Sequence, residues 1–198
     1  MSLANTILKT KLLLIILLLL SIPVFAEVNT ESIKQDFDFR QTNWGMTMNE
    51  VLTTESLKVV SNENNRVFYQ TSILNKDCYL FYYFENDNKL SSAGYFFDIK
   101  HTNPNDYIED YLKLQDSLCS KYGEPITNKI VWKNNLYRNN QQFWGLAISM
   151  GHLQYKSTWE TITTKISLNL YGDNYQNNLM IVYSDKNYIS ETPATEGL

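Results

Sequence analysis

The sequence predicts an α+β fold in which two tandem units, each a helix followed by an antiparallel hairpin, form one sheet with the helices packed on one face. Two stretches of alternating aromatic and aliphatic residues, at 78–99 and 158–184, have the pattern of hairpins. A helical pattern precedes each of them. Both hairpins turn on short polar runs, at 85–88 and 171–174, although any two hairpins share such features.

The first unit spans residues 36–102. Its elements are expected in the order helix, two strands and hairpin, at 48–55, 57–60, 67–74, 78–84 and 90–99. Thr47 and Glu50 form a capping-box pattern, in which each side chain bonds the backbone amide of the other residue, and this predicts the start of the helix. Aromatic residues fall on both faces of the 78–84 strand, which predicts a central position in the sheet.

The second unit spans residues 103–185 and begins with a long helix over 104–122. Asn103 is expected as its N-cap, with Pro104 in the first helical position, and Gly123 as its end. Apolar residues spaced three and four apart predict the buried stripe: Ile108, Tyr111, Leu112, Leu118, Cys119 and Tyr122.

After the helix, the sequence predicts a strand, a short helix closed by Gly151, one long strand and a final strand. These elements are expected near 129–132, within 140–150, over 158–171 and over 178–184. The long strand is expected to alternate through Ile162 and Ile166.

The N-terminus has the pattern of a secretory signal. Lysines 9 and 11 precede an aliphatic run at 12–20, and Val24-Phe25-Ala26 suits signal peptidase. We therefore expect a signal peptide over 1–26, cleaved after Ala26, and an exported protein that is periplasmic or secreted. An uncleaved anchor is the alternative, but the apolar run is shorter than the roughly 20 residues that span a bilayer.

The exported part is expected to be acidic, either one domain or two small modules that share a core, with no stable membrane span. Flexible segments are expected at 27–35 and 186–198. Loss of the two leader lysines changes the net charge from −4 to −6, which disfavours nucleic acid as a partner. Aromatic residues make up 14% of the chain, more than a minimal core needs, so some should reach the surface.

No catalytic residue, metal-ligand set or cofactor site is predicted. His101 and His152 are the only histidines, and neither has cysteines or carboxylates beside it at ligand spacing. The residues around Ser149 resemble the Gly-x-Ser-x-Gly motif of hydrolase nucleophiles only weakly. Glu109 and Asp110 are expected as solvating charges on the polar face of the long helix.

Two pairs of residues are candidate functional positions. Phe143 and Trp144 lie in a polar neighbourhood, which favours an exposed aromatic binding surface, whereas Trp44 and Trp159 are expected in the core. Cys78 and Cys119 are the only cysteines and both would be exported. They can form one disulfide, and the alternative is two reduced core residues.

The run RQTNWGMT at 40–47, followed by Glu50 and Val51, resembles the opening motif of a family of exported bacterial proteins without an assigned function. The runs KYGEP at 121–125 and LYGDN at 170–174 are similar to later landmarks of that family. The expected fold is also similar to the β-lactamase inhibitor proteins and the small outer-membrane assembly lipoproteins, although this chain lacks the acylated cysteine. These resemblances imply no catalytic residues.

We therefore expect a noncatalytic binding or interaction module of the bacterial envelope or exterior. Its partner would be a protein or an envelope ligand, and an inhibitor or assembly-factor role is one form of this hypothesis. A cell-wall hydrolase with an unrecognised active site is the alternative, and a structural envelope component comes third.

Overall fold

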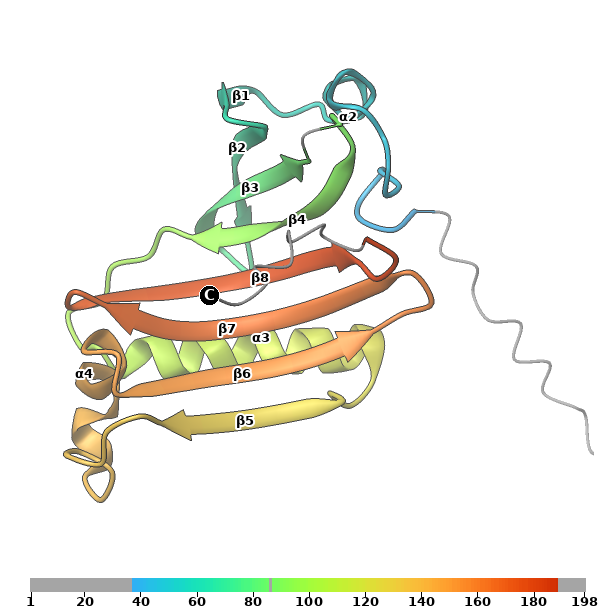
Figure 1. Cartoon of the computed structure of the whole chain (residues 1–198). Helices are drawn as coiled ribbons and strands as arrows, with labels where there is room; N and C mark the ends of the chain where they lie inside the picture. The colour runs from blue at the N-terminus through green and yellow to red at the C-terminus, as the bar shows by residue number, and fades with distance from the viewer. Residues whose placement is uncertain (1–36, 86, 189–198) are drawn as a thin grey trace, which may run out of the picture. The chain divides into compact units, whose positions relative to one another are not determined.

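The computed structural model describes residues 37–85 and 87–188 (Figure 1). The predicted signal peptide, the 27–35 segment and most of the predicted tail lie outside the described residues.

One eight-stranded antiparallel sheet dominates the described chain, with the strand order β1-β2-β3-β4-β8-β7-β6-β5. The strands are β1 Val59–Glu63, β2 Arg66–Ile73, β3 Lys76–Phe84, β4 Leu90–Phe97, β5 Thr127–Trp132, β6 Leu153–Glu160, β7 Thr164–Asp173 and β8 Gln176–Asp185. Strands β1 to β4 lie side by side in chain order, and so do β5 to β8. The two sets meet at the centre of the sheet, where β4 pairs with β8 (Figure 1). The predicted boundary near residue 102 thus falls between two halves of one continuous sheet.

Alternation along the strands defines a first, buried face of the sheet. One cross-strand row on this face crosses six strands through Val67, Tyr82, Ala93, Tyr183, Ile166 and Trp159. Every member is at most 7% exposed. Burial of such a row stabilises the fold because each large side chain removed from water contributes about 1.5–3 kcal/mol.

Three α-helices accompany the sheet in the described chain: α2 Met48–Thr54, α3 Asp106–Tyr122 and α4 Trp144–Ser149, the last preceded by a 3₁₀ turn, η1, at Gln141–Phe143. The predicted capping box of α2 is confirmed, because both reciprocal bonds between Thr47 and Glu50 are present. None of the described helices is long and apolar enough to cross a membrane.

The long helix α3 contacts β6, β7 and β8 and lies behind β6 and β7 in Figure 1. Its Tyr111 hydroxyl and Gln115 amide both reach the buried Ser157 hydroxyl of β6, at 2.6 and 2.7 Å. The predicted end at Gly123 is confirmed, with φ +80° and its amide bonded to the Cys119 carbonyl. The Gly123 carbonyl then accepts from the Trp159 indole at 2.9 Å, which places Trp159 in the core as predicted.

The predicted stripe and start of α3 need correction. Leu112 is 46% exposed, whereas Asp110, expected to be a solvating charge, is only 3% exposed. The helix begins at Asp106 and its N-cap is Asn105 rather than Asn103. The Asn105 side chain bonds the backbone near α4 instead of capping its own helix. The spacing of apolar residues predicted the wrong buried face of α3. Asp110 and Gln115 can be buried because each bonds polar partners inside the protein.

The predicted long strand over 158–171 is wrong. Two strands, β6 and β7, occupy this region, and Ile162 is 89% exposed at the turn between them. The first five residues of β6 lie outside the predicted strand. The turn lacks the Gly, Pro and Asn residues that mark most hairpin turns, so the sequence alternates through it without an interruption.

Candidate functional site

The second face of the sheet carries an aromatic hollow over β2, β3, β4 and β8. Alternation turns Phe68, Phe81 and Phe96 away from the buried face, and each is half-buried. The hollow encloses about 440 Å³ and is lined by Arg66, Phe68, Phe81, Tyr83, Ser92, Phe96, Met180 and Val182. We call it the open-face hollow.

Gly94 lies at the middle of this surface, paired with Phe81 on one side and Val182 on the other. A Cβ atom at this position would lie 3.0 Å from the tip of the Phe81 ring and 2.1 Å from the Ile181 carbonyl oxygen. The Phe81 ring therefore occupies the space that a side chain would need, as aromatic residues do opposite glycine in sheets.

The chemistry of the open-face hollow suits apolar contact. Arg66 is the only cation among the described residues that line it, and its guanidinium lies 5.3 Å from the centre of the Tyr83 ring, in cation–π contact. Within the part of the chain that the structure describes, no carboxylate, histidine or thiol lines the hollow. The hollow can receive a bulky apolar side chain, and besides Arg66 its polar lining residues are Tyr83 and Ser92.

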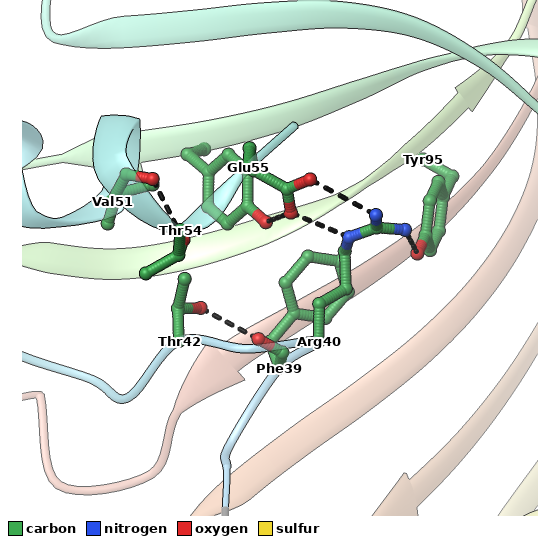
Figure 2. A network of polar contacts seen from close by, with 8 residues as sticks. Phe39, Arg40, Thr42, Val51, Thr54, Glu55 and Tyr95 are labelled. Atoms are coloured by element: carbon green, nitrogen blue, oxygen red, sulfur yellow. Dashed lines mark hydrogen bonds and ion pairs between the residues drawn. The ribbon is translucent and has the colours of Figure 1, made fainter. Parts of the chain in front are cut away.

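A separate polar network surrounds Arg40, the first residue of the RQTNWGMT run (Figure 2). The Arg40 guanidinium donates to both carboxylate oxygens of Glu55, at 2.7 and 3.1 Å, and to the Tyr95 hydroxyl at 3.4 Å. Tyr82 also donates to Glu55. Burial first, and then the Glu55 hydrogen bond, raises the pKa of Tyr82 far above its ordinary range, so this phenol keeps its proton.

Residues 39–44, which include the start of this run, contact both halves of the sheet. Phe39 packs its ring on Tyr82 and Tyr183, with centroids 5.7 and 4.8 Å apart. The Trp44 indole donates to the Thr164 hydroxyl of β7 at 2.9 Å. The polar groups of the network thus bond to one another, and this part of the run stabilises the fold.

His101 forms a third cluster, with Asp110 and Lys76. Nε2 of His101 lies 2.7 Å from one Asp110 oxygen, and the Lys76 ammonium lies 2.5 Å from the other. These contacts give the buried Asp110 its partners and connect α3 with the start of β3. Among residues 37–85 and 87–188, no group of three histidines, cysteines or acids is arranged to hold a metal ion.

Phe143 and Trp144 lie at the junction of η1 and α4. Phe143 is 37% exposed and packs on Tyr137, with ring centroids 5.5 Å apart. Trp144 is half-buried, meets the Trp132 ring edge to face at 5.7 Å and donates to the Arg138 carbonyl at 3.2 Å. The pair lies outside the open-face hollow, and its role in binding stays a prediction.

Cys78 and Cys119 are free thiols in the structure, so the predicted disulfide is not formed there. Cys78 is buried on β3, and burial raises its pKa to about 11. Such a thiol is protonated at neutral pH and is a poor nucleophile. Cys78 is thus a core residue in the structure, whereas Cys119 on α3 is half-buried.

Sequence reasoning missed the open-face hollow. The available signal was β3 itself, where Tyr79, Phe81 and Tyr83 alternate with Leu80 and Tyr82. From these aromatic residues on both faces, the sequence analysis predicts only a central position of the strand in the sheet and no exposed aromatic surface. Comparisons with models of protein families, with curated proteins and with solved structures find no match.

Proposed function

We propose that the protein is a noncatalytic binding module of the bacterial envelope or exterior, and that the open-face hollow receives a bulky apolar side chain of a partner protein. The observation that supports this proposal is the contiguous, solvent-facing aromatic surface over β2, β3, β4 and β8. Contiguous apolar patches of this kind mark interaction sites when they occur on folded domains.

The arrangement of the sheet supports the same function. We propose that the halves are two tandem units whose helices cover one face and leave the other for a partner. Tyr82 and Tyr95, which contact the segment near α2, share a face with Ser157, which contacts α3. A broad sheet surface presented in this way suits an inhibitor or assembly factor.

A cell-wall hydrolase is the competing function. Glycoside hydrolysis needs two carboxylates that flank a bound substrate. The two enclosed carboxylates named above, Glu55 and Asp110, are each held by a cation, at 2.7 and 2.5 Å, and by a second donor. Their engagement favours binding over catalysis.

Site-specific photo-crosslinking in the producing bacterium tests the proposal. A benzophenone amino acid in place of Phe68 or Phe96 puts the reactive group in the open-face hollow. The matched control is the same replacement at Tyr175, an aromatic residue that is 73% exposed in the β7–β8 turn. We expect one discrete protein adduct from positions 68 and 96 and none from position 175.

Equal adducts from all three positions, or none from any, would contradict the proposal. Incubation of the purified protein with cell-wall fragments tests the competing function, because a hydrolase would release soluble sugar or peptide ends. If the protein releases such ends, and Phe68→Ser leaves the release unchanged while Glu55→Gln abolishes it, hydrolysis would replace binding as the function.

A further inference from the structure

The surface that contains the open-face hollow continues across the second half of the sheet. A cross-strand row leaves the hollow and crosses β7, β6 and β5 on the same face. Its members, in order across the sheet, are Tyr79, Phe96, Met180, Asn169, Lys156 and Lys129. The apolar hollow and two lysines thus lie on one surface.

Lys129 and Lys156 lie directly opposite each other on β5 and β6, and both are exposed. Within the described part of the chain, neither has a carboxylate within the 4.0 Å of an ion pair. Like charges opposite each other destabilise a sheet. A lysine on the edge strand β5 discourages edge-to-edge pairing, but this does not explain Lys156, one strand further in.

The charge of this pair contrasts with the rest of the protein. The chain is acidic overall, with 21 acids and 17 basic residues. The acid on the same face of β6, Glu160, is bound to Lys186 at 2.8 Å. The lysine pair therefore presents uncompensated positive charge beside an apolar hollow, and its natural complement is an anion attached to an apolar group.

We infer that the open face binds an extended peptide segment of the partner, with a bulky apolar side chain in the open-face hollow and acidic residues over Lys129 and Lys156. This inference rests on the proposed function. Strands in a sheet lie about 4.8 Å apart, so Lys156 on β6 is roughly 10 Å from Met180 on β8. An extended peptide advances about 3.3 Å per residue and directs alternate side chains to the same side. For an apolar anchor over Phe96 on β4, Lys156 and Lys129 lie three and four strands away, so the acids belong four and six residues from the anchor.

The shape of the hollow favours a peptide over an anionic lipid. Sites that hold small apolar molecules bury most of the ligand in a cleft or cavity. The open-face hollow is lined by side chains from one face of one sheet. It can cover one side chain, and a peptide can then cross the neighbouring strands to the lysines.

Three synthetic peptides of equal length test the inference by fluorescence titration of the purified protein. The first has a tryptophan with aspartates four and six residues later, the second has asparagines in place of the aspartates, and the third has alanine in place of the tryptophan. We expect the acidic tryptophan peptide to bind about fivefold more tightly than its asparagine form, as for two exposed ion pairs. Salt should reduce this difference.

The double variant Lys129→Gln/Lys156→Gln should lose the fivefold difference and keep its affinity for the asparagine peptide. Lys58→Gln/Lys113→Gln, which removes two exposed lysines elsewhere, should keep the difference. Equal affinity of wild type for both tryptophan peptides would overturn the inference and leave the proposed function standing. If the alanine peptide bound as well as the others, the proposed function would fail too. If vesicles of phosphatidylglycerol bound more tightly than the peptides, the ligand would be a lipid and not a peptide.

Discussion

Arg40 shows how one residue of a recognisable run takes its role from its surroundings. Its backbone lies in the left-handed region at φ +52°, beside the bridge between Phe39 and Thr42 that closes a tight loop. This loop places Phe39 in the core and aims the guanidinium at Glu55, whose side chain is 4% exposed (Figure 2). Glu55 depends on Arg40 because a buried carboxylate without its cation is strongly unfavourable.

Replacement of Arg40 should therefore destabilise the protein. We expect Arg40→Ala to lower the free energy of unfolding by about 3 kcal/mol, because it leaves Glu55 buried with only a phenol as its partner. Urea unfolding measures this change. Arg138→Ala removes an exposed guanidinium whose one hydrogen bond among the described residues is to the nearby Asn135 side chain, so it should change stability by less than about 0.5 kcal/mol. Equal effects of the two replacements would contradict the structural role of Arg40.

At the scale of elements, α2 depends on its first turn. The helix has only seven residues, too few to be stable without tertiary contacts and caps. The Thr47 amide, and then its hydroxyl, donate to the Glu50 carboxylate and lower its pKa below the ordinary value of 4.5. Because the pKa is lower in the folded state, the ionised carboxylate favours folding.

This shift predicts a pH dependence of stability. The contribution of Glu50 is fully present above pH 4.5 and is lost as the pH falls through the lower pKa of the folded state. We expect the unfolding free energy of Glu50→Gln to fall less steeply than that of wild type on acidification below about pH 5. Thermal unfolding followed by circular dichroism at several pH values measures the slope.

Glu109→Gln is the control for Glu50→Gln, because it also removes one exposed acid from the first turn of a helix. On acidification, the unfolding free energy of Glu109→Gln should fall more steeply than that of Glu50→Gln. Identical slopes for wild type and Glu50→Gln would show that the capping carboxylate does not contribute.

At the scale of the whole molecule, the two halves of the chain meet in one sheet and share the residues that carry the proposed site. The open-face hollow takes side chains from β2, β3 and β4 of the first half and from β8 of the second. The lysine pair lies entirely on β5 and β6. Binding across this face would therefore depend on the whole sheet rather than on either half.

The expected export of the molecule stays a prediction. The Leu-rich run after two lysines and the Val24-Phe25-Ala26 site predict that the protein made by its natural host begins at Glu27. N-terminal sequencing or intact-mass measurement of the native protein checks this. A product that keeps residues 12–20 would instead be anchored, and the proposed partner would then have to lie at the membrane surface.

Local sequence signals were sufficient wherever a structure depends on neighbouring residues. The capping box of α2, the end of α3 at Gly123 and the hairpin of β3 and β4 were predicted because each is decided within a few residues. The hidden turn at Ile162 was missed because its residues carry no strong turn preference, and pairing between β6 and β7 decides its position.

The sequence by itself determined the α+β class, the acidic charge and the main helix and strand signals, because these follow from composition, periodicity and capping chemistry. Only the tertiary structure decided that Asp110 is buried, since its partners Lys76 and His101 come from outside α3. The same holds for the open-face hollow and the lysine pair. Strand order and register bring Phe81, Met180 and Lys156 onto one surface, and these depend on pairing between segments up to about a hundred residues apart.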